Sequence, residues 1–253
     1  MTIVHIHIER TGGVSLQNLY EKKYLNSNIL WYSVRDGLFA PLSIKTASYT
    51  KGWQLKLYYF ICEKLPTIRK LMLIIREMKR KRQNVPVEKL GNAKVIIGHF
   101  SASDMLPYLS ADKNKYRSVI REPIDRMWSH YNYWIDHTGN VGQRVVPTYK
   151  KAIKFEEFAL LPELINYQSR ALGEDLSIYE LIGVTDYLKD FAIEAGLLNK
   201  SDQMLKINNF SNKIPDLDKN FIELFKKLHN KDYELYNKIR NNWKDTKLYK
   251  NSF

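Results

Sequence analysis

The sequence is poor in cysteine and has no long hydrophobic run. Cys62 is its only cysteine, so the chain cannot form an internal disulfide and is compatible with a reducing compartment. Cys62 lies in an apolar stretch with a helical pattern, which predicts a core residue. The most apolar run, at residues 71–75, is much too short to span a bilayer, and the first predicted strand begins too early for a secretory signal to precede it. We therefore expect a cytoplasmic protein without a transmembrane segment.

Two common nucleotide-binding motifs are also absent. The sequence contains neither the Gly-x-x-x-x-Gly-Lys-Ser/Thr string of the NTPase P-loop nor the Gly-x-Gly-x-x-Gly string of dinucleotide-binding folds. The first absence argues against a nucleotide kinase-like phosphotransferase. No recognisable nucleic-acid-binding motif occurs either, so we expect no nucleic-acid partner.

Positive charge is in excess, with 40 Lys and Arg against 27 Asp and Glu and a formal net charge of +13. Either the surface is generally basic without a specific partner, or it attracts an anion such as a nucleotide, an acidic glycan, a nucleic acid or a membrane surface. The densest basic run, residues 76–82, ends a helical, basic insertion that we place at about 53–83. This run is explained either as a solvated helix end or as a guide for an acidic acceptor or anionic lipid.

Strand-like runs alternate with helical patterns along the chain. Several of the runs are apolar throughout, as in strands that are buried on both faces. The alternation predicts one α/β domain over residues 1–253, a three-layer α/β/α fold with a mostly parallel sheet. The predicted strands are residues 3–8, 94–100, 116–120, 181–185 and 204–207. Two amphipathic helices are predicted at 218–228 and 231–243, the first with a core face of Phe221, Leu224, Phe225 and Leu228.

The first fifteen residues predict an anion-binding loop. Residues 5–8 have the pattern of a buried strand, residues 9–13 that of a tight loop with two glycines, and residues 14–20 that of a helix. The free N–H groups and the dipole of a helix N-terminus favour a bound anion. The sequence therefore predicts that this loop holds a phosphate or a sulfate.

A second cationic group follows the strand that ends at Ile120. Arg121 comes at the carboxyl edge of the predicted sheet, where ligands bind in open α/β folds, and Pro123 is suited to the first turn of the next helix. A guanidinium at that edge suits a phosphate group. On the helix, the predicted core face holds Ile124, Met127, Trp128, Tyr131 and Ile135. The opposite face holds Arg126, Ser129 and Tyr133, which is either a solvated face or part of the site.

Histidines mark two further positions. His99 follows the apolar residues 95–97 and Gly98, so it emerges at the end of a predicted strand, either as a structural histidine or as a general base. His5 and His7 lie two apart on the first strand and face the same side. A metal site there lacks an evident third ligand, so we favour sheet packing and expect no metal.

Taken in order, these segments resemble the PAPS-dependent sulfotransferases (PAPS is 3′-phosphoadenosine 5′-phosphosulfate), specifically the carbohydrate branch with the heparan sulfate 2-O- and 6-O-enzymes. Residues 7–15, His-Ile-Glu-Arg-Thr-Gly-Gly-Val-Ser, resemble the loop that binds the 5′-phosphosulfate. Residues 121–129, Arg-Glu-Pro-Ile-Asp-Arg-Met-Trp-Ser, resemble the 3′-phosphate motif, and Gly98-His99 resembles the segment with the catalytic base. Residues 166–170 and 182–185, together with Asp232 and the Leu235-Tyr236 pair, resemble later landmarks, so the likeness runs from about residue 3 to residue 240.

The resemblance implies an enzyme with the P-loop-like sulfotransferase fold, which transfers a sulfuryl group from PAPS to an acceptor hydroxyl and releases PAP, without a metal. A carbohydrate is the favoured acceptor. His99 is expected as the base and Arg10 as the cation at the leaving group. Donor contacts are expected from Arg10, Thr11, Gly12, Gly13, Val14, Ser15, Arg121 and Ser129. Gln168 and Arg170 are expected either to contact donor or acceptor or to serve the helix that carries them.

Two residues depart from the pattern of the carbohydrate branch. Arg10 stands where that branch usually has lysine, although the tyrosylprotein sulfotransferases have arginine in a similar loop. Glu9 stands where it usually has proline, and we expect its carboxylate to point away from the donor or to pair with a nearby arginine. These departures support one alternative, a protein that binds PAP, PAPS or an acidic glycan without turnover. A second alternative is a sulfotransferase that acts on a small metabolite or a peptide tyrosine, because these also offer a hydroxyl.

Overall fold

The computed structural model describes residues 1–24, 29–35, 38–41, 93–138, 154–204 and 214–246. The predicted helical insertion at 53–83, with Cys62 and the basic run 76–82, lies outside these residues. Among the described residues, no helix has both the length and the apolar character that are needed to cross a membrane.

A six-stranded sheet forms the centre of the molecule, in the order β3-β2-β4-β1-β5-β6. All neighbouring strands are parallel except β3, which pairs antiparallel with β2 at one edge. The mostly parallel sheet expected from the sequence is therefore confirmed. The strands are β1 (Ile3–Ile6), β2 (Ile29–Arg35), β3 (Leu38–Pro41), β4 (Val95–His99), β5 (Lys115–Ile120) and β6 (Tyr179–Val184).

The strand predictions missed one end of the sheet and included one run that is not seen as a strand. β2 and β3 were not predicted. Met204 lies outside any strand, and residues 205–207 of the predicted fifth strand lie outside the described part of the chain.

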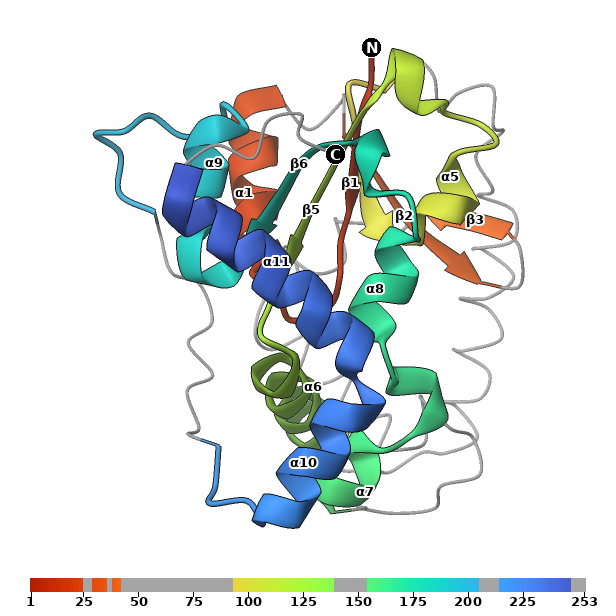
Figure 1. Cartoon of the computed structure of the whole chain (residues 1–253). Coiled ribbons are helices and arrows are strands. Elements are labelled where there is room, and N and C mark those ends of the chain that lie inside the picture. Colours follow the sequence, from red (N-terminus) through yellow and green to blue (C-terminus); the bar gives the residue numbers. More distant parts are fainter. Residues whose placement is uncertain (25–28, 36–37, 42–92, 139–153, 205–213, 247–253) are drawn as a thin grey trace, which may run out of the picture.

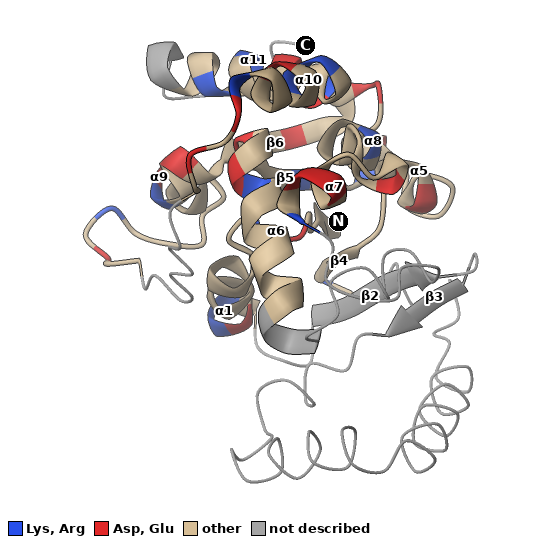
Figure 2. Cartoon of the chain, turned by 90° about the horizontal axis from the view of Figure 1, so that it is seen from below, with Lys and Arg blue, Asp and Glu red and all other residues tan. Residues whose placement is uncertain are grey.

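Helices cover the sheet and one of its ends. The α-helices are α1 (Gly13–Tyr24), α5 (Ala102–Met105), α6 (Pro123–Thr138), α7 (Phe155–Ala159), α8 (Tyr167–Leu172), α9 (Leu188–Glu194), α10 (Lys219–Leu228) and α11 (Asn230–Thr246). Short 3-10 turns lie at Ala111–Lys113, Pro162–Leu164, Leu176–Ile178 and Thr185–Tyr187. α6 lies beyond the carboxyl ends of β1 and β5, below them in Figure 1 and in front of them in Figure 2.

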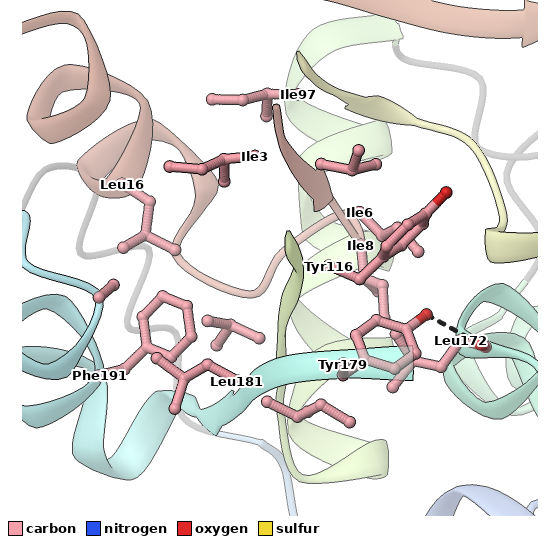
Figure 3. Packing of buried hydrophobic residues seen from close by; sticks show 14 of the residues in the cluster. Ile3, Ile6, Ile8, Leu16, Ile97, Tyr116, Leu172, Tyr179, Leu181 and Phe191 are labelled. Atoms are coloured by element: carbon pink, nitrogen blue, oxygen red, sulfur yellow. Dashed lines mark hydrogen bonds between the residues drawn. The ribbon is translucent and has the colours of Figure 1, made fainter. Parts of the chain in front are cut away.

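The main core has side chains on both faces of the strands. Leu16 from α1 and Phe191 from α9 gather on one side, whereas Tyr116, Tyr179 and Leu172 pack on the other (Figure 3). The Tyr179 hydroxyl donates to the carbonyl of Leu172 at 2.8 Å, so the hydroxyl of this buried ring is satisfied. The layers on both faces confirm the three-layer α/β/α architecture.

Two residues predicted for the core lie at its edge. Leu224 of α10 is 44% exposed and Ile135 of α6 is 39% exposed. In α10 the buried residues are Phe221 and Phe225, so Leu224 falls beyond the margin of the buried stripe. In α6, Arg126 and Ser129 of the predicted polar face are buried. The helix is therefore rotated so that Ile135 lies toward the solvent.

Candidate functional site

The loop between β1 and α1 has an unusual backbone. Arg10 and Gly12 both adopt left-handed conformations, with φ of 70° and 84°. A left-handed conformation costs a non-glycine residue such as Arg10 about 1–3 kcal/mol, and such residues concentrate at functional sites. The buried Thr11 hydroxyl donates to the carbonyl of Ile8 at 2.8 Å and closes the turn. The first N–H groups of α1 then face the loop, in the arrangement that binds anions.

Gly13 makes room for the ring of His7. A Cβ atom on Gly13 would lie 1.7 Å from Cε1 of His7, so only glycine fits at this position. The loop therefore rests directly on the His7 ring. Ser15 is buried in the first turn of α1, whereas Val14 beside it is 43% exposed.

Arg10 joins this loop to α6. Its Nε donates to the Ser129 hydroxyl at 3.0 Å, and its guanidinium carbon lies 5.0 Å from the centre of the Tyr133 ring. Burial lowers the pKa of Arg10. The structure thus brings together two residues that the sequence assigned to opposite ends of a donor, 119 positions apart.

Arg121 is held at the sheet edge by Gln168. The Gln168 carboxamide accepts from the Arg121 N–H at 2.9 Å and donates to the Arg121 carbonyl at 2.8 Å. Asp232 in turn accepts from the N–H groups of Gln168 and Ser169. Among the described residues, the Arg121 guanidinium has no hydrogen bond or ion pair, so its planar fork is available to an anion.

The two tentative substrate residues on α8 differ in their placement. Gln168 is completely buried, and its side chain bonds to the Arg121 backbone as described above. Arg170 is exposed and donates to the carbonyl of Glu163. Their contact with a substrate remains a prediction.

His99 ends β4, beside the β1–α1 loop. Its Nδ1 lies 3.0 Å from the carbonyl oxygen of His7 and 3.3 Å from Oε1 of Glu9. Because a carbonyl only accepts, Nδ1 carries the proton and Nε2 keeps the lone pair. The His99 side chain is one-third exposed, so it is accessible.

A buried polar cluster lies behind His99. Arg126 is 1% exposed and packs over the Tyr167 ring, with its guanidinium carbon 5.0 Å from the ring centre. The solvated-face explanation of Arg126 and Ser129 is therefore wrong, because α6 is covered on that side. Among the described residues, the three guanidinium nitrogens of Arg126 and Oε2 of Glu9 have no hydrogen-bond partner.

Glu9 is charged within this cluster. Burial raises the pKa of its carboxyl, but His99, His130 and the Tyr167 hydroxyl outweigh burial and lower the pKa to about 2. Its carboxylate faces His99 and, among the described residues, forms no ion pair with an arginine. The expected pairing with an arginine is therefore not seen, whereas the alternative that Glu9 points away from the donor stays a prediction.

His5 is part of the packing on the opposite face of β1. It is 1% exposed, its Nδ1 lies 3.4 Å from the Tyr20 hydroxyl, and burial lowers its pKa to about 3. Its partner in the sequence pattern, His7, instead contacts His99, with ring centres 4.8 Å apart. In the part of the chain that the structure describes, no three His, Cys, Asp or Glu residues gather as metal ligands.

A cavity of about 300 Å³ lies along α1, next to the loop. The sequence prediction included only Ser15 among its lining residues. The other lining residues on α1 are Asn18, Leu19 and Lys22. They follow Ser15 at helical spacings of three, four and seven residues, and this spacing is the sequence signal that could have identified them. The lining comprises Ser15, Asn18, Leu19, Lys22, Leu198, Asp202, Gln203 and Met204.

Comparisons with known proteins give only distant structural likenesses. No family model and no curated protein matches the sequence. The chain is similar to retinol dehydratase in complex with retinol and PAP, at 16% identity and a TM-score of 0.41, over 80% of this chain and 61% of that one. It is similar to a sulfotransferase from Alicyclobacillus acidocaldarius at 12% identity and a TM-score of 0.43, over 95% of this chain and 96% of that one. It is similar to mouse sulfotransferase SULT7A1 complexed with PAP at 14% identity and a TM-score of 0.37, over 95% of this chain and 85% of that one.

The chain thus spans 61% of the length of the retinol dehydratase chain. The α/β architecture rests on the strand order and the helix layers of this structure, because likenesses with such low TM-scores assign neither a fold nor a family.

Proposed function

We propose that this protein is a PAPS-dependent sulfotransferase, which transfers a sulfuryl group to a hydroxyl of an acceptor, preferentially a carbohydrate. The observation that carries the proposal is the convergence of three segments at one edge of the sheet. Arg10 comes from the loop after β1, His99 is the last residue of β4, and Arg121 directly follows β5; these three strands are neighbours in the sheet. Ligands of open parallel sheets bind at this edge.

The loop and its surroundings fit a doubly anionic donor. Gly13 leaves no side chain between the His7 ring and the first N–H groups of α1, which suits the 5′-phosphosulfate. Arg121 and Ser129 suit the 3′-phosphate. Thr11, Gly12 and Val14 complete the proposed donor loop.

The proposed reaction is an in-line displacement at sulfur. The acceptor oxygen forms a bond to sulfur, the bond from sulfur to the bridging oxygen of the 5′-phosphate breaks, and PAP leaves with that electron pair. The hydroxyl proton passes to Nε2 of His99, which holds the lone pair. Arg10 and the loop N–H groups stabilise the charge on the leaving oxygen, an effect worth about 100- to 1,000-fold in rate for each donor.

The preference for a carbohydrate acceptor rests on the likeness of Gly98-His99 to the carbohydrate branch. A panel of oligosaccharides, a tyrosine peptide, retinol and a hydroxysteroid therefore tests the acceptor. Each is incubated with PAPS, and mass spectrometry detects the gain of one sulfate. If only an oligosaccharide is sulfated, the full proposal is supported. If another compound is sulfated instead, sulfuryl transfer stands and the carbohydrate acceptor is contradicted.

Two variants and an assay for ATP turnover separate sulfuryl transfer from the alternatives. His99→Ala is expected to bind PAP as the native protein does, by calorimetry, and to lose turnover; Arg240→Ala, at an exposed ion pair with Asp186, is expected to keep both. Binding of PAP without product from any acceptor favours a binding protein. Absence of PAP binding, or turnover of ATP with magnesium, contradicts the proposal.

A further inference from the structure

Glu9 and His99 form a contact that the resemblance does not predict. The family pattern has proline at the position of Glu9, and a proline has no carboxylate to offer. In this chain, Oε1 of Glu9 lies 3.3 Å from Nδ1 of His99. The same Nδ1 lies 3.0 Å from the carbonyl of His7. The Nδ1 hydrogen bond is made to the carbonyl, and the carboxylate lies beside it at ion-pair distance; both groups belong to the β1–α1 region.

We propose that Glu9 is a positioning residue that orients the His99 imidazole and balances the charge that His99 acquires when it accepts a proton at Nε2. This inference rests on the proposed sulfuryl transfer, in which His99 is the base. The His7 carbonyl alone fixes the tautomer, because it requires a proton on Nδ1. A carbonyl carries no net charge, however, and only the carboxylate offers a full counter-charge to the imidazolium.

The surroundings keep Glu9 ionised and fixed. Burial would favour its neutral form, but His99, His130 and the Tyr167 hydroxyl lower its pKa to about 2. Arg126 is buried nearby, and the Glu9 charge raises the pKa of its guanidinium against the larger effect of burial. The carboxylate is therefore a permanent negative charge at neutral pH.

Several charged or titratable groups face this pair from the packed elements. The β1–α1 region contributes His7 and Arg10, α6 contributes Arg126 and His130, and α8 contributes Tyr167. Burial keeps His7 and His130 neutral by lowering their pKa values, to about 3 for His130. Near neutral pH, Glu9 is thus the only anionic group among these neighbours of His99.

The test is a charge change at Glu9 with the size of the side chain preserved. Glu9→Gln is expected to lower kcat about 10- to 100-fold, part of the gain that a general base supplies, with PAP affinity unchanged. Because an adjacent anion favours the imidazolium, its removal is expected to move the acidic limb of the kcat/KM profile to lower pH. In Glu9→Asp, which keeps the negative charge, the midpoint of this acidic limb is expected to lie close to its native pH.

NMR titration of the ligand-free protein makes the test independent of turnover. The His99 signal is identified among the six histidines by its loss in His99→Gln. Its midpoint is expected to move to lower pH in Glu9→Gln and to stay in place in Glu180→Gln. Glu180 is a matched control, because it is 30% exposed, as against 29% for Glu9, and pairs with Lys115 and Arg117 instead.

The possible results separate the two proposals. An unchanged His99 midpoint in Glu9→Gln overturns the role of Glu9, whether or not the protein transfers sulfate. A shifted midpoint with an unchanged pH profile overturns it as well, because the pair would then lie outside the reaction. A shifted midpoint in a protein that sulfates no acceptor contradicts the proposed function and leaves the coupling of Glu9 to His99 intact.

Discussion

The Nε of Arg10 donates a hydrogen bond to the hydroxyl of Ser129 at 3.0 Å. This bond connects the loop at the start of the chain with the second turn of α6. Both residues are among those that we propose for the donor, and the bond places them in one site. It also gives Ser129 two possible roles, as a partner of Arg10 and as a ligand of the 3′-phosphate.

Ser129→Ala tests these roles. The variant loses the hydroxyl that meets Arg10 and, in our proposal, the 3′-phosphate. We expect an affinity for PAP that is about 10- to 150-fold weaker, because a hydrogen bond to a charged group contributes about 1.5–3 kcal/mol. The affinity for adenosine 5′-phosphate is expected to change much less. Calorimetry with both nucleotides measures the difference, and an equal loss for the two would contradict a contact with the 3′-phosphate.

Gln168→Leu tests the support of Arg121. The replacement leaves the N–H and the carbonyl of Arg121 without their partners at 2.9 and 2.8 Å. We expect a loss of about 1–3 kcal/mol in the free energy of unfolding, because buried polar groups are then unsatisfied. PAP affinity is expected to fall as well, since the Arg121 backbone is no longer fixed.

Gln17→Leu is the matched control for this substitution. Among the described residues, Gln17 bonds only to Glu21 on the same helix, so its loss is expected to change stability by no more than about 0.5 kcal/mol. Urea denaturation measures both variants. Equal stability of Gln168→Leu and the native protein would show that the amide does not support Arg121.

Gly13→Ala tests the close packing of the loop on His7. The new Cβ would lie 1.7 Å from Cε1 of His7, so the ring or the loop must move. Because the His7 carbonyl and ring both contact His99, we expect lower stability together with weaker PAP binding. Thermal unfolding and calorimetry are the measurements. A variant with native values of both would mean that the loop has room to shift.

Stability is expected to fall as the pH decreases below about 6.5. Burial lowers the pKa values of His5 and His130 to about 3, so the folded state keeps them neutral while the unfolded chain binds protons near pH 6.5. Each contribution is therefore present in full above pH 6.5 and is lost as the pH falls toward 3, by up to about 1.4 kcal/mol per pH unit. Glu9 adds to the loss only below about pH 4.5.

His130→Gln isolates one of these contributions. The glutamine oxygen is expected to accept from Trp134 Nε1, as His130 Nε2 does at 2.8 Å, and it does not titrate. Urea denaturation between pH 6.5 and 5 is expected to show a smaller slope for the variant. An identical slope would place the pH dependence elsewhere.

The sequence predicted the local elements of the site because their signals are local. The apolar runs around Val4, Ile96 and Val119 predicted buried strands, and the two glycines with the helix that follows predicted an anion loop. β2 and β3 were missed although their signal is local too: residues 29–34 are mostly apolar, and the Asp36-Gly37 pair that follows them is typical of a hairpin turn. Leu224 and Ile135 were misplaced because helical spacing alone does not define which edge of an apolar stripe meets the core.

By itself, the sequence determined the α/β class and the residue types at the ends of β1, β4 and β5. The tertiary structure alone decided which of these side chains meet: that Arg10 contacts Ser129, that Gln168 fixes the Arg121 backbone, and that Glu9 faces His99 rather than an arginine. The physical reason is that helix and strand signals act over a few residues. These contacts join segments up to 119 residues apart, and only the order and register of the sheet bring such segments together.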